Sequence, residues 1–599
     1  RFWKSSRGIV MIYFEETIFD SQENDEICFS CKADLNNSSK YRNFKICSEC
    51  NFHFHIPAKE RINLVVDSGS FKEINKNLSS SFEQIAQEEL ENYDEKIKSD
   101  QFRTGLNEAV VSGTAKINGE DIIIIALDFG FLGGSMGLIV GEKIALAYEL
   151  AAKKKFPVIT IINSGGTRIQ EGVISLMQMS KTVSAANLLK NSNIPMLTIL
   201  CNPSTGQTMS SFATLSDIII GEPGARIGYS SYRKLRNKNS DDSKNQYTSE
   251  EFLKKGFIDL VVSRDELKYK ISLLISILKP KYSYKSKKIK INKNKNFKFN
   301  SALEALKISR NINRPKSSIY INNIFSEFIE LHGDRIGNDD NSVIVGIGKI
   351  ANEPFILVAQ ERMIITKSSN NVSRNYNNKI LPSGFRKANR ALKLAEKFNI
   401  PCLCLVDAVY PELSLKSEYS GLAYSISELL SNKLNLETPI LSIIIGEGGS
   451  ETALAFSIAD SIMMQKNSIF TPLSPEEAAK IKLGDSRKVK EISNMMRFTS
   501  EDCLKLGIID RIIDEPNEGS HQNHLESAKL LQEGILEELS LIKDVYPKTL
   551  AKRRSNKFRK MGDYSQNYKT DLRTEINIWS SAFRAGVSTF RSKPLSKEE

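Results

Sequence analysis

Four cysteines near the start of the chain have the spacing of a metal site. Cys28 and Cys31 form one Cys-x-x-Cys pair, Cys47 and Cys50 form a second, and fifteen residues separate the two pairs. Four thiolates presented by two tight turns can close a tetrahedron around Zn²⁺ and leave no open position for water. The spacing therefore predicts a structural zinc ribbon and not a catalytic metal centre.

The other cysteines do not share this spacing. They lie mostly in apolar runs, which predicts that they are core residues: Cys201, Cys402, Cys404 and Cys503. His53 and His55 follow the second pair closely, but four thiolates already complete a zinc shell. These two histidines are therefore expected to be packing or surface residues and not ligands.

A second candidate for chemistry is the segment IINSGGTRIQEGVISLMQMSKT, residues 161–182. It is expected to begin as a strand, to turn at Ser164, Gly165 and Gly166, and then to enter a helix. Two residues without side chains would let a ligand oxygen approach main-chain N–H groups at the positive end of the helix. Stabilisation of an enolate or another oxyanion requires this arrangement. The alternative is a tight turn that only needs positive φ angles.

Another glycine-rich loop, FGFLGGSMGLIVGEK at 129–143, also follows an expected strand and contains Gly133, Gly134 and Gly137. It does not fit the Gly-x-x-x-x-Gly-Lys-Ser/Thr phosphate-binding pattern. Taken alone, a loop of this kind is a weak indicator of function. The chain also shows no persuasive arrangement of nucleophile and base, and its five histidines leave few candidates for a general base.

Length and composition indicate a soluble protein of several domains. The chain has 599 residues, of which 40% are hydrophobic and 26% are charged, and this length predicts two to four domains. No apolar run reaches the roughly 18 to 20 residues that span a bilayer. Paired cysteines at zinc spacing favour a reducing compartment. The basic opening residues lack the apolar core of a signal peptide, Met11 is an alternative start, and a transit peptide remains open.

The net charge of +12 is concentrated in one segment. Residues 279–300 contain nine lysines and no acidic residue. This Lys/Asn/Ser-rich composition cannot bury a core, so a solvated linker is the favoured interpretation over a dedicated nucleic-acid patch.

The sequence on either side of this linker repeats a pattern. Residues 196–230 parallel residues 440–474, because each has an apolar strand, a small polar loop with glycine, a helix and a second strand. Residues 248–262 (TSEEFLKKGFIDLVV) parallel residues 499–513 (TSEDCLKLGIIDRII) in the same way. The repeat predicts two related α/β domains of ββα units, with ligand sites at the strand-to-helix loops.

Several segments carry a resemblance to a known family. FLGGSMGLIVGEK, SGGTRIQEGVISLMQMSKT and the cysteine ribbon resemble the β subunit of the carboxyltransferase of bacterial and plastid acetyl-CoA carboxylase. The second half is similar to the α subunit in NRPKSSIYINNIFSEFIELHGDR (313–335), LPSGFRKANRALKLAEKFNIP (381–401), IGEGGSETALAF (445–456) and SPEEAAKI (474–481). The chain thus resembles a fused β–α carboxyltransferase.

The resemblance implies a fold, a reaction and partners. The fold would be a pair of crotonase-like (ClpP/crotonase) ββα-superhelix domains, preceded by a small zinc ribbon. The reaction would transfer a carboxyl group from biotin on a separate carrier protein to acetyl-CoA, giving malonyl-CoA for fatty acid synthesis, with N1′ of biotin taking the methyl proton. The partners would be biotin carboxyl carrier protein, biotin carboxylase and a second copy of the chain. The expected location is the bacterial cytoplasm, with the plastid stroma as the alternative.

The resemblance also assigns site residues. Gly165 and Gly166 would hold the thioester enolate oxygen, and main-chain N–H groups at Thr452 and Ala453 would serve the ureido oxygen of biotin. Five further glycines would belong to the substrate- and cofactor-binding loops: Gly133, Gly134, Gly137, Gly448 and Gly449.

The sequence departs from the family at several of these places. The family's Gly-Glu-Gly-Gly-Ser-Gly-Gly-Ala becomes GEGGSETA at 446–453, so that Glu451 and Thr452 replace two glycines. Gln207 stands where a second glycine is expected, and DAVYPELS at 407–414 lacks both glycines of the family's turn. A degenerate or structural paralogue is therefore an alternative function, and a zinc-ribbon nucleic-acid-binding protein is an alternative of another class.

These observations together predict an order of domains along the chain. The expected ranges are an N-terminal extension at 1–27, the zinc ribbon at 28–50, a β-subunit-like domain at 51–278, the linker at 279–300, an α-subunit-like domain at 301–564 and a tail at 565–599.

Overall fold

The computed structural model describes residues 27–78, 87–230, 247–279, 299–362, 379–408 and 410–561, with the main chain alone for residues 87–92. The predicted N-terminal extension except Ile27, nearly all of the lysine-rich linker and the whole predicted tail lie outside these residues. The chain divides into two compact units, residues 1–555 and 556–599. The domain boundaries given above stay a prediction.

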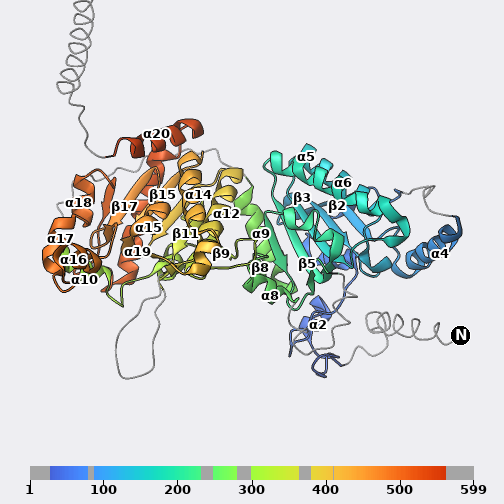
Figure 1. The fold of residues 1–599 in the computed structure, drawn as a ribbon. Coiled ribbons are helices and arrows are strands. Elements are labelled where there is room, and N and C mark those ends of the chain that lie inside the picture. Colours follow the sequence, from blue (N-terminus) through green and yellow to red (C-terminus); the bar gives the residue numbers. More distant parts are fainter. Residues whose placement is uncertain are drawn as a thin grey trace, which may run out of the picture. The chain divides into compact units, whose positions relative to one another are not determined.

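The first part of the chain forms one eight-stranded sheet (Figure 1). Its order is β1-β2-β3-β4-β5-β6-β8, and β7 pairs with β5. β1, β2 and β3 pair antiparallel, and the remaining pairs are parallel. The strands are β1 (Lys72–Glu73), β2 (Val110–Ile117), β3 (Glu120–Leu127), β4 (Val158–Ser164), β5 (Met196–Thr205), β6 (Ile218–Gly221), β7 (Ile227–Gly228) and β8 (Leu260–Val261).

The central strands of this sheet are buried along nearly their whole length. In β3 every residue from Ile122 to Leu127 is buried, and all of β4 is buried. A continuous apolar run is what a parallel strand needs when helices cover both faces of its sheet. The carboxyl ends of β3, β4 and β5 lie at the same edge, because these strands are parallel to one another.

The second part of the chain forms a seven-stranded sheet with the order β19-β17-β15-β13-β11-β10-β9. β9, β10 and β11 pair antiparallel, and the others are parallel. Two small sheets, β12-β14 and β16-β18, accompany it. The strands are β9 (Glu327–Leu331), β10 (Val343–Ile350), β11 (Glu353–Gln360), β12 (Lys379–Ile380), β13 (Cys402–Val406), β14 (Tyr410–Pro411), β15 (Ile440–Ile444), β16 (Glu447–Gly449), β17 (Ser461–Gln465), β18 (Ile469–Thr471) and β19 (Arg511–Ile513).

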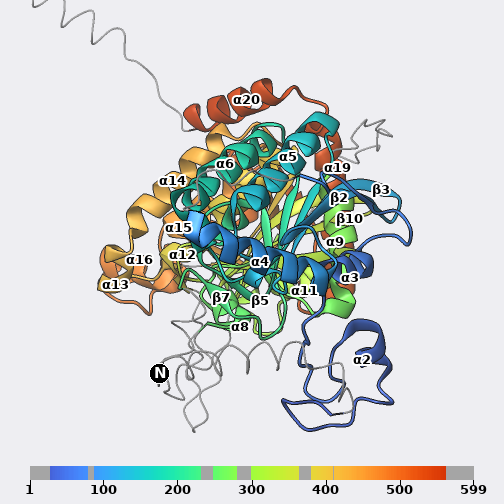
Figure 2. The same ribbon diagram turned by 90° about the vertical axis from the view of Figure 1, so that its right-hand side faces the viewer.

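Helices accompany both sheets, and Figure 2 shows α5 and α6 side by side. In the first part they are α2 (Ser39–Phe44), α3 (Ala58–Val65), α4 (Gln87–Thr104), α5 (Leu138–Lys154), α6 (Gly172–Asn191), α8 (Ser249–Lys254) and α9 (Arg264–Leu278). In the second part they are α10 (Ala302–Ser309), α11 (Ser317–Ile324), α12 (Pro382–Phe398), α13 (Leu415–Tyr419), α14 (Leu422–Asn435), α15 (Ser450–Ser457), α16 (Pro475–Leu483), α17 (Val489–Met496), α18 (Ser500–Lys505), α19 (His524–Ile542) and α20 (Pro547–Arg559).

The core of the second sheet follows from the alternation of side chains along its strands. Alternate residues such as Leu357 of β11, Leu403 of β13 and Leu441 of β15 pack with α11 and α19 in one buried cluster. The residues between them point to the opposite face, where α12 contacts β10 and β11. The alternation therefore places this sheet between α11 and α19 on one face and α12 on the other.

The predicted repeat of residues 248–262 and 499–513 is present. In the first copy Thr248 caps α8, which precedes β8, and in the second copy Thr499 caps α18, which precedes β19. Gly256 and Gly507 end the two helices, each at a φ of 69°. The two segments have similar sequences because each helix needs a threonine cap at its start and a left-handed glycine at its end. The repeat of residues 196–230 and 440–474 is present only in part, because the predicted helix of the first copy is replaced by two short 3-10 turns, whereas the second copy has α15. Within the described residues, no helix combines the length and apolarity needed to cross a bilayer.

Candidate functional site

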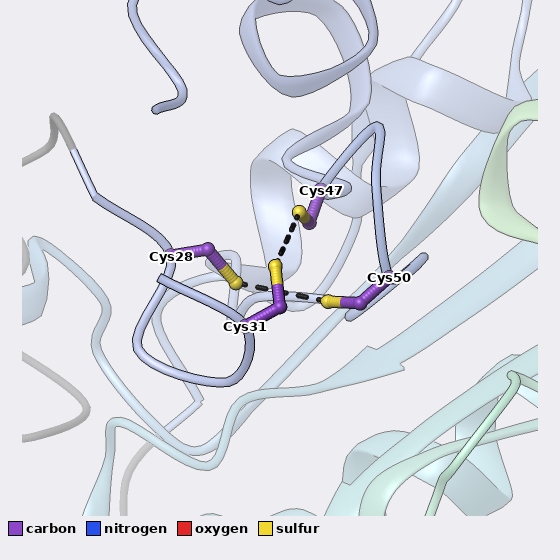
Figure 3. Close-up of side chains that lie close together, drawn as sticks. All are labelled: Cys28, Cys31, Cys47 and Cys50. Atoms are coloured by element: carbon purple, nitrogen blue, oxygen red, sulfur yellow. Dashed lines mark hydrogen bonds between the residues drawn. The ribbon is translucent and has the colours of Figure 1, made fainter. Parts of the chain in front are cut away.

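The four predicted metal ligands converge on one point (Figure 3). The Sγ atoms of Cys28 and Cys50 lie 3.8 Å apart and those of Cys31 and Cys47 lie 3.6 Å apart. All four Sγ atoms lie within 4.8 Å of one another. A zinc ion held tetrahedrally at about 2.3 Å from each sulfur would separate the sulfurs by about 3.8 Å. The cluster therefore has the composition and spacing to hold a metal ion.

The ribbon that carries these cysteines has its own small core. Cys28, Cys47, Leu35, Tyr41 and Phe54 are buried together. A β-bridge between Ile46 and His53 closes the second turn, and Ser38 caps α2. The chain is thus folded locally so that both Cys-x-x-Cys turns face one another.

Arg264 fixes the ribbon to the first sheet. Its guanidinium donates to the carbonyl oxygens of Phe44 and Phe54, at 2.9 and 3.1 Å, and forms paired bonds with the buried carboxylate of Glu222, which follows β6. His53 Nε2 accepts a hydrogen bond from the main-chain N–H of Arg264 at 3.2 Å. Burial lowers the pKa of His53, which keeps the imidazole neutral and able to accept this bond. The prediction that His53 is a packing residue is confirmed by this contact.

The glycine-rich loop at 129–143, after β3, and the glycine turn at 164–166, after β4, meet at the carboxyl ends of these strands. Gly165 N–H donates to the Gly133 carbonyl at 2.8 Å, and Met136 N–H donates to the Gly166 carbonyl at 2.7 Å. Gly166 N–H donates to the hydroxyl of Ser164 at 3.1 Å. The N–H of Gly165 is therefore used within the protein, whereas the N–H of Gly166 contacts a hydroxyl group, which can rotate away.

The helix after these glycines starts later than the sequence predicts. Thr167 forms a parallel bridge with Met136, and a short 3-10 turn at Ile169–Glu171 precedes α6, which begins at Gly172. The expectation that the helix follows Gly166 directly was wrong. The bridge keeps the chain extended after the glycines, so the positive end of α6 is displaced along the chain from Gly166.

The other two predicted glycines of the first part have close neighbours that exclude a side chain. A Cβ atom on Gly134 would lie 2.1 Å from the Asn163 carbonyl oxygen, and one on Gly137 would lie 2.3 Å from Oε1 of Glu171. These contacts give both positions a packing reason to be glycine. A role of Gly133, Gly134 and Gly137 in cofactor binding stays a prediction.

The glycine segment at 446–453 has the predicted helix, but its glycines lie in a short strand where a loop was expected. Gly448 and Gly449 lie in β16, and α15 begins directly afterwards, with Thr452 and Ala453 in its first turn. Gly449 N–H donates to the Ala408 carbonyl at 2.9 Å. Thr452 and Ala453 are fully buried, whereas Glu451 is exposed. The Thr452 side chain therefore lies inside the fold, and its Oγ1 has no hydrogen-bond partner among the described residues.

Comparison with known proteins identifies the family. A family model described as acetyl co-enzyme A carboxylase carboxyltransferase-like matches residues 265–562. A relative from Clostridium tetani, named acetyl-coenzyme A carboxylase carboxyl transferase subunits beta/alpha, is 38% identical over 540 residues, which cover 90% of this chain and 93% of the relative. The chain belongs to the acetyl-CoA carboxylase carboxyltransferase family. A relative of the same name from Natranaerobius thermophilus is 36% identical, over 92% of this chain and 93% of the relative.

Solved structures confirm the crotonase-like fold expected for this carboxyltransferase family. The structure of transcarboxylase 12S with methylmalonyl-coenzyme A and methylmalonic acid bound has a TM-score of 0.60 at 19% identity, over 80% of this chain and 90% of that one. A single-chain, multi-domain long-chain acyl-CoA carboxylase has a TM-score of 0.59 at 15% identity, over 78% of this chain and 45% of that one.

Gln207, which stands where the carboxyltransferase family has a glycine, makes hydrogen bonds that hold the fold together. Its amide nitrogen donates to the carbonyl oxygens of Ser175 and Leu176 in α6, at 2.7 and 3.2 Å. Gly206, its neighbour, lies next to Gly166. Gln207 therefore ties the loop after β5 to the first turns of α6, a contact that a glycine cannot make.

Charged residues that the sequence did not single out hold the second carboxyltransferase loop. Arg310 forms paired bonds with both Glu447 of β16 and Glu476 of α16, with the shortest contacts at 2.6 Å. Arg314 donates to the Ile445 carbonyl at 2.8 Å and forms paired bonds with Glu515. The partners are more than a hundred residues apart in sequence, so no local pattern could reveal them.

Proposed function

We propose that this protein is the carboxyltransferase component of an acetyl-CoA carboxylase, which transfers the carboxyl group of carboxybiotin to acetyl-CoA and yields malonyl-CoA. The likeness to fused beta/alpha relatives over nine-tenths of the chain supports this proposal, because both halves of the enzyme are present in order. The product would serve fatty acid biosynthesis.

In the proposed reaction the first glycine loop handles the acyl-CoA. Biotin on its carrier protein would supply CO₂ and, at N1′, the base that takes the methyl proton of acetyl-CoA, so that the enolate carbon could bond to CO₂. Gly166 N–H would stabilise the enolate oxygen when the Ser164 hydroxyl turns away, and Gly165 would hold the loop through its bond to Gly133. Gly133, Gly134 and Gly137 would line the same site.

The second glycine loop would handle the biotin. Main-chain N–H groups in the first turn of α15, at Thr452 and Ala453, would face the ureido oxygen, and Gly448 and Gly449 would allow the ring to approach. Thr452 is compatible with this role, because its side chain is buried within the fold and does not extend into solvent beside the loop. The exposed position of Glu451 keeps its carboxylate in water, where screening weakens its effect.

The ribbon would hold a structural zinc ion. Cys28, Cys31, Cys47 and Cys50 would fill all four tetrahedral positions, which leaves no place for substrate on the metal. Zinc would therefore supply folding energy to the ribbon and take no part in carboxyl transfer.

The partners follow from the same proposal. Biotin would arrive on a separate biotin carboxyl carrier protein, charged by a separate biotin carboxylase in a bacterial cytoplasm. The active protein would be at least a homodimer, in which the first half of one copy meets the second half of the other. Nucleic-acid binding would be a secondary property.

The test is the reverse reaction, with malonyl-CoA and biocytin as substrates and purified protein of measured zinc content. Release of acetyl-CoA that depends on biocytin would support the carboxyltransferase. Folded, zinc-loaded protein without turnover would instead support a non-catalytic paralogue, for which Glu451 and Thr452 are the specific departures in sequence.

A further inference from the structure

Arg168 is a fully buried arginine that follows the first glycine loop. Its side chain has no exposed area, and its guanidinium forms paired bonds with the carboxylate of Glu108, at 2.7 and 2.8 Å. A buried charge is stable only when it is paired and its hydrogen-bonding groups are satisfied. Glu108 lies sixty residues earlier in the chain, just before β2, and supplies that pairing.

The other edge of the same guanidinium reaches the neighbouring glycine loop. Arg168 Nη2 donates to the Ser135 carbonyl at 3.0 Å, and Arg168 Nε donates to the Ser135 hydroxyl at 3.2 Å. Ser135 lies between Gly134 and Met136, so one rigid group joins the residues after Gly166 to the loop after β3. A guanidinium presents its donors in a fixed plane, which a lysine cannot reproduce.

The main chains of the two loops are joined beside this side chain. Gly165 N–H donates to the Gly133 carbonyl, Met136 N–H donates to the Gly166 carbonyl, and Arg168 N–H donates to the Met136 carbonyl at 3.2 Å. Arg168 therefore takes part in this ladder through its main chain and braces it through its side chain.

The same cluster also fixes the start of α5. The carboxylate of Glu171 accepts from Tyr93 OH and from the Leu138 N–H, which is the first N–H of α5, and it lies 3.4 Å from Arg168. The loop from Gly133 to Gly137 is thus held at its middle by Arg168 and at its end by Glu171.

We propose that Arg168 is a positioning residue, whose guanidinium sets the distance between the loop at 133–137 and the loop at 165–168. The inference rests on the proposed function, in which the Gly166 N–H donates to the enolate oxygen. The distance between the two loops controls the direction of this N–H. A donor misplaced by about 1 Å can lower a rate on the order of a hundredfold. Arg168 acts through the loops and does not touch substrate.

The experiment compares Arg168→Lys with Arg554→Lys. Arg554 is a matched control, because it is equally buried and forms paired bonds with Asp460, together with bonds to three main-chain carbonyls in the second part of the chain. Both substitutions keep the positive charge and remove the paired hydrogen bonds of a guanidinium. Any loss of activity or stability that follows only from losing such buried paired bonds is therefore common to both variants.

Two readouts are made on each full-length protein. We expect Arg168→Lys to lower kcat of the reverse reaction about 10- to 100-fold with little change in KM for malonyl-CoA, and Arg554→Lys to leave kcat unchanged. Amide hydrogen exchange at Gly165, at Met136 and at the main-chain N–H of position 168 should become about tenfold faster in Arg168→Lys alone. Equal effects of the two substitutions, or unchanged exchange at these amides, would overturn the proposal.

The exchange readout separates this inference from the proposed function. If the unaltered protein shows no turnover, the function fails, yet amide exchange still tests whether Arg168 holds the loops. If Arg168→Lys does not fold, Ser135→Ala removes one acceptor and leaves Glu108 in place. That variant should speed exchange at Met136 and lower kcat severalfold, and a variant with neither change would also overturn the proposal.

Discussion

Gly166 and Gly206 lie next to each other at the carboxyl ends of β4 and β5, with little room for a side chain between them. A Cβ atom on Gly206 would lie 3.1 Å from the Gly166 Cα, and a Cβ atom on Gly166 would lie 3.4 Å from the Gly206 Cα. The loops after β4 and β5 are therefore close together at this point, and a side chain on Gly206 would require its neighbour to shift by a few tenths of an ångström.

Substitution of Gly166 by valine should abolish carboxyl transfer. Gly166 has a φ of 114°, which an L-residue rarely adopts, so valine adds both strain and volume beside Gly206. We expect kcat in the reverse assay to fall at least about a hundredfold, while circular dichroism still shows a folded protein. Gly69→Ala is the control, because Gly69 also has a positive φ, of 70°, but has open space around it. Normal turnover by Gly166→Val would remove this loop from the mechanism.

Substitution of Cys47 by serine should release zinc from the ribbon. Serine is a poor zinc ligand, and loss of one thiolate opens a closed tetrahedral shell. We expect metal analysis of the purified variant to show little zinc, with increased proteolysis within residues 28–55. Cys503→Ala should keep its zinc, because Cys503 is buried in α18 and is outside the cluster. Full zinc retention by Cys47→Ser would contradict the ligand assignment.

The buried pair of Glu515 and Arg314 should make stability depend on pH. Burial would raise the pKa of Glu515, but the Arg314 guanidinium outweighs this effect and lowers the pKa to about 2. The unfolded value is about 4.3. The ionised carboxylate therefore adds on the order of 3 kcal/mol of unfolding free energy above pH about 4.3, and this contribution is lost as the pH falls toward 2.

Denaturant unfolding between pH 6 and 3 checks this dependence. The difference in unfolding free energy between the unaltered protein and Glu515→Gln should shrink as the pH falls, with roughly half of the 3 kcal/mol gone by pH 3. Glu501→Gln, which removes an exposed ion pair with Lys505, should change the unfolding free energy little at any pH. A difference for Glu515→Gln that stays constant across this range would contradict the prediction.

Substitution of Thr452 by alanine should be tolerated. The Thr452 side chain is buried and its Oγ1 has no hydrogen-bond partner among the described residues, whereas the main-chain N–H is kept in alanine. We expect the unfolding free energy to change by no more than about 1 kcal/mol and kcat to stay within about threefold. A large loss of kcat at unchanged stability would show that the hydroxyl itself serves the reaction.

Local patterns in the sequence predicted the parts of the structure that depend on local physics. The four cysteines converge because their spacing builds two facing turns. The repeated Thr-Ser-Glu segments fold alike because each carries its own cap and its own terminal glycine. The helix expected after Gly448 and Gly449 is present as well, and it begins directly after them.

The parts that were missed depend on partners far away in the sequence. The late start of α6 results from the bridge between Thr167 and Met136 and from the buried pair of Arg168 and Glu108, and neither partner is visible from the glycine motif. The ionic support of the second loop is similar, because Arg310 and Glu447 are 137 residues apart. From the sequence alone, such charged residues would be assigned to the solvated surface, because their partners become neighbours only in the folded chain.

Two of the contacts that attach the ribbon are made by its main-chain carbonyls. Arg264 contacts Phe44 and Phe54 by their carbonyl oxygens, which every amino acid possesses. These two bonds do not depend on which side chains stand at the two positions, although the Phe54 side chain belongs to the ribbon's core and His53 adds a side-chain contact. A ribbon from another protein with the same backbone course, the same four cysteines and this histidine should dock in its place, which makes this module a candidate for transplantation between chains.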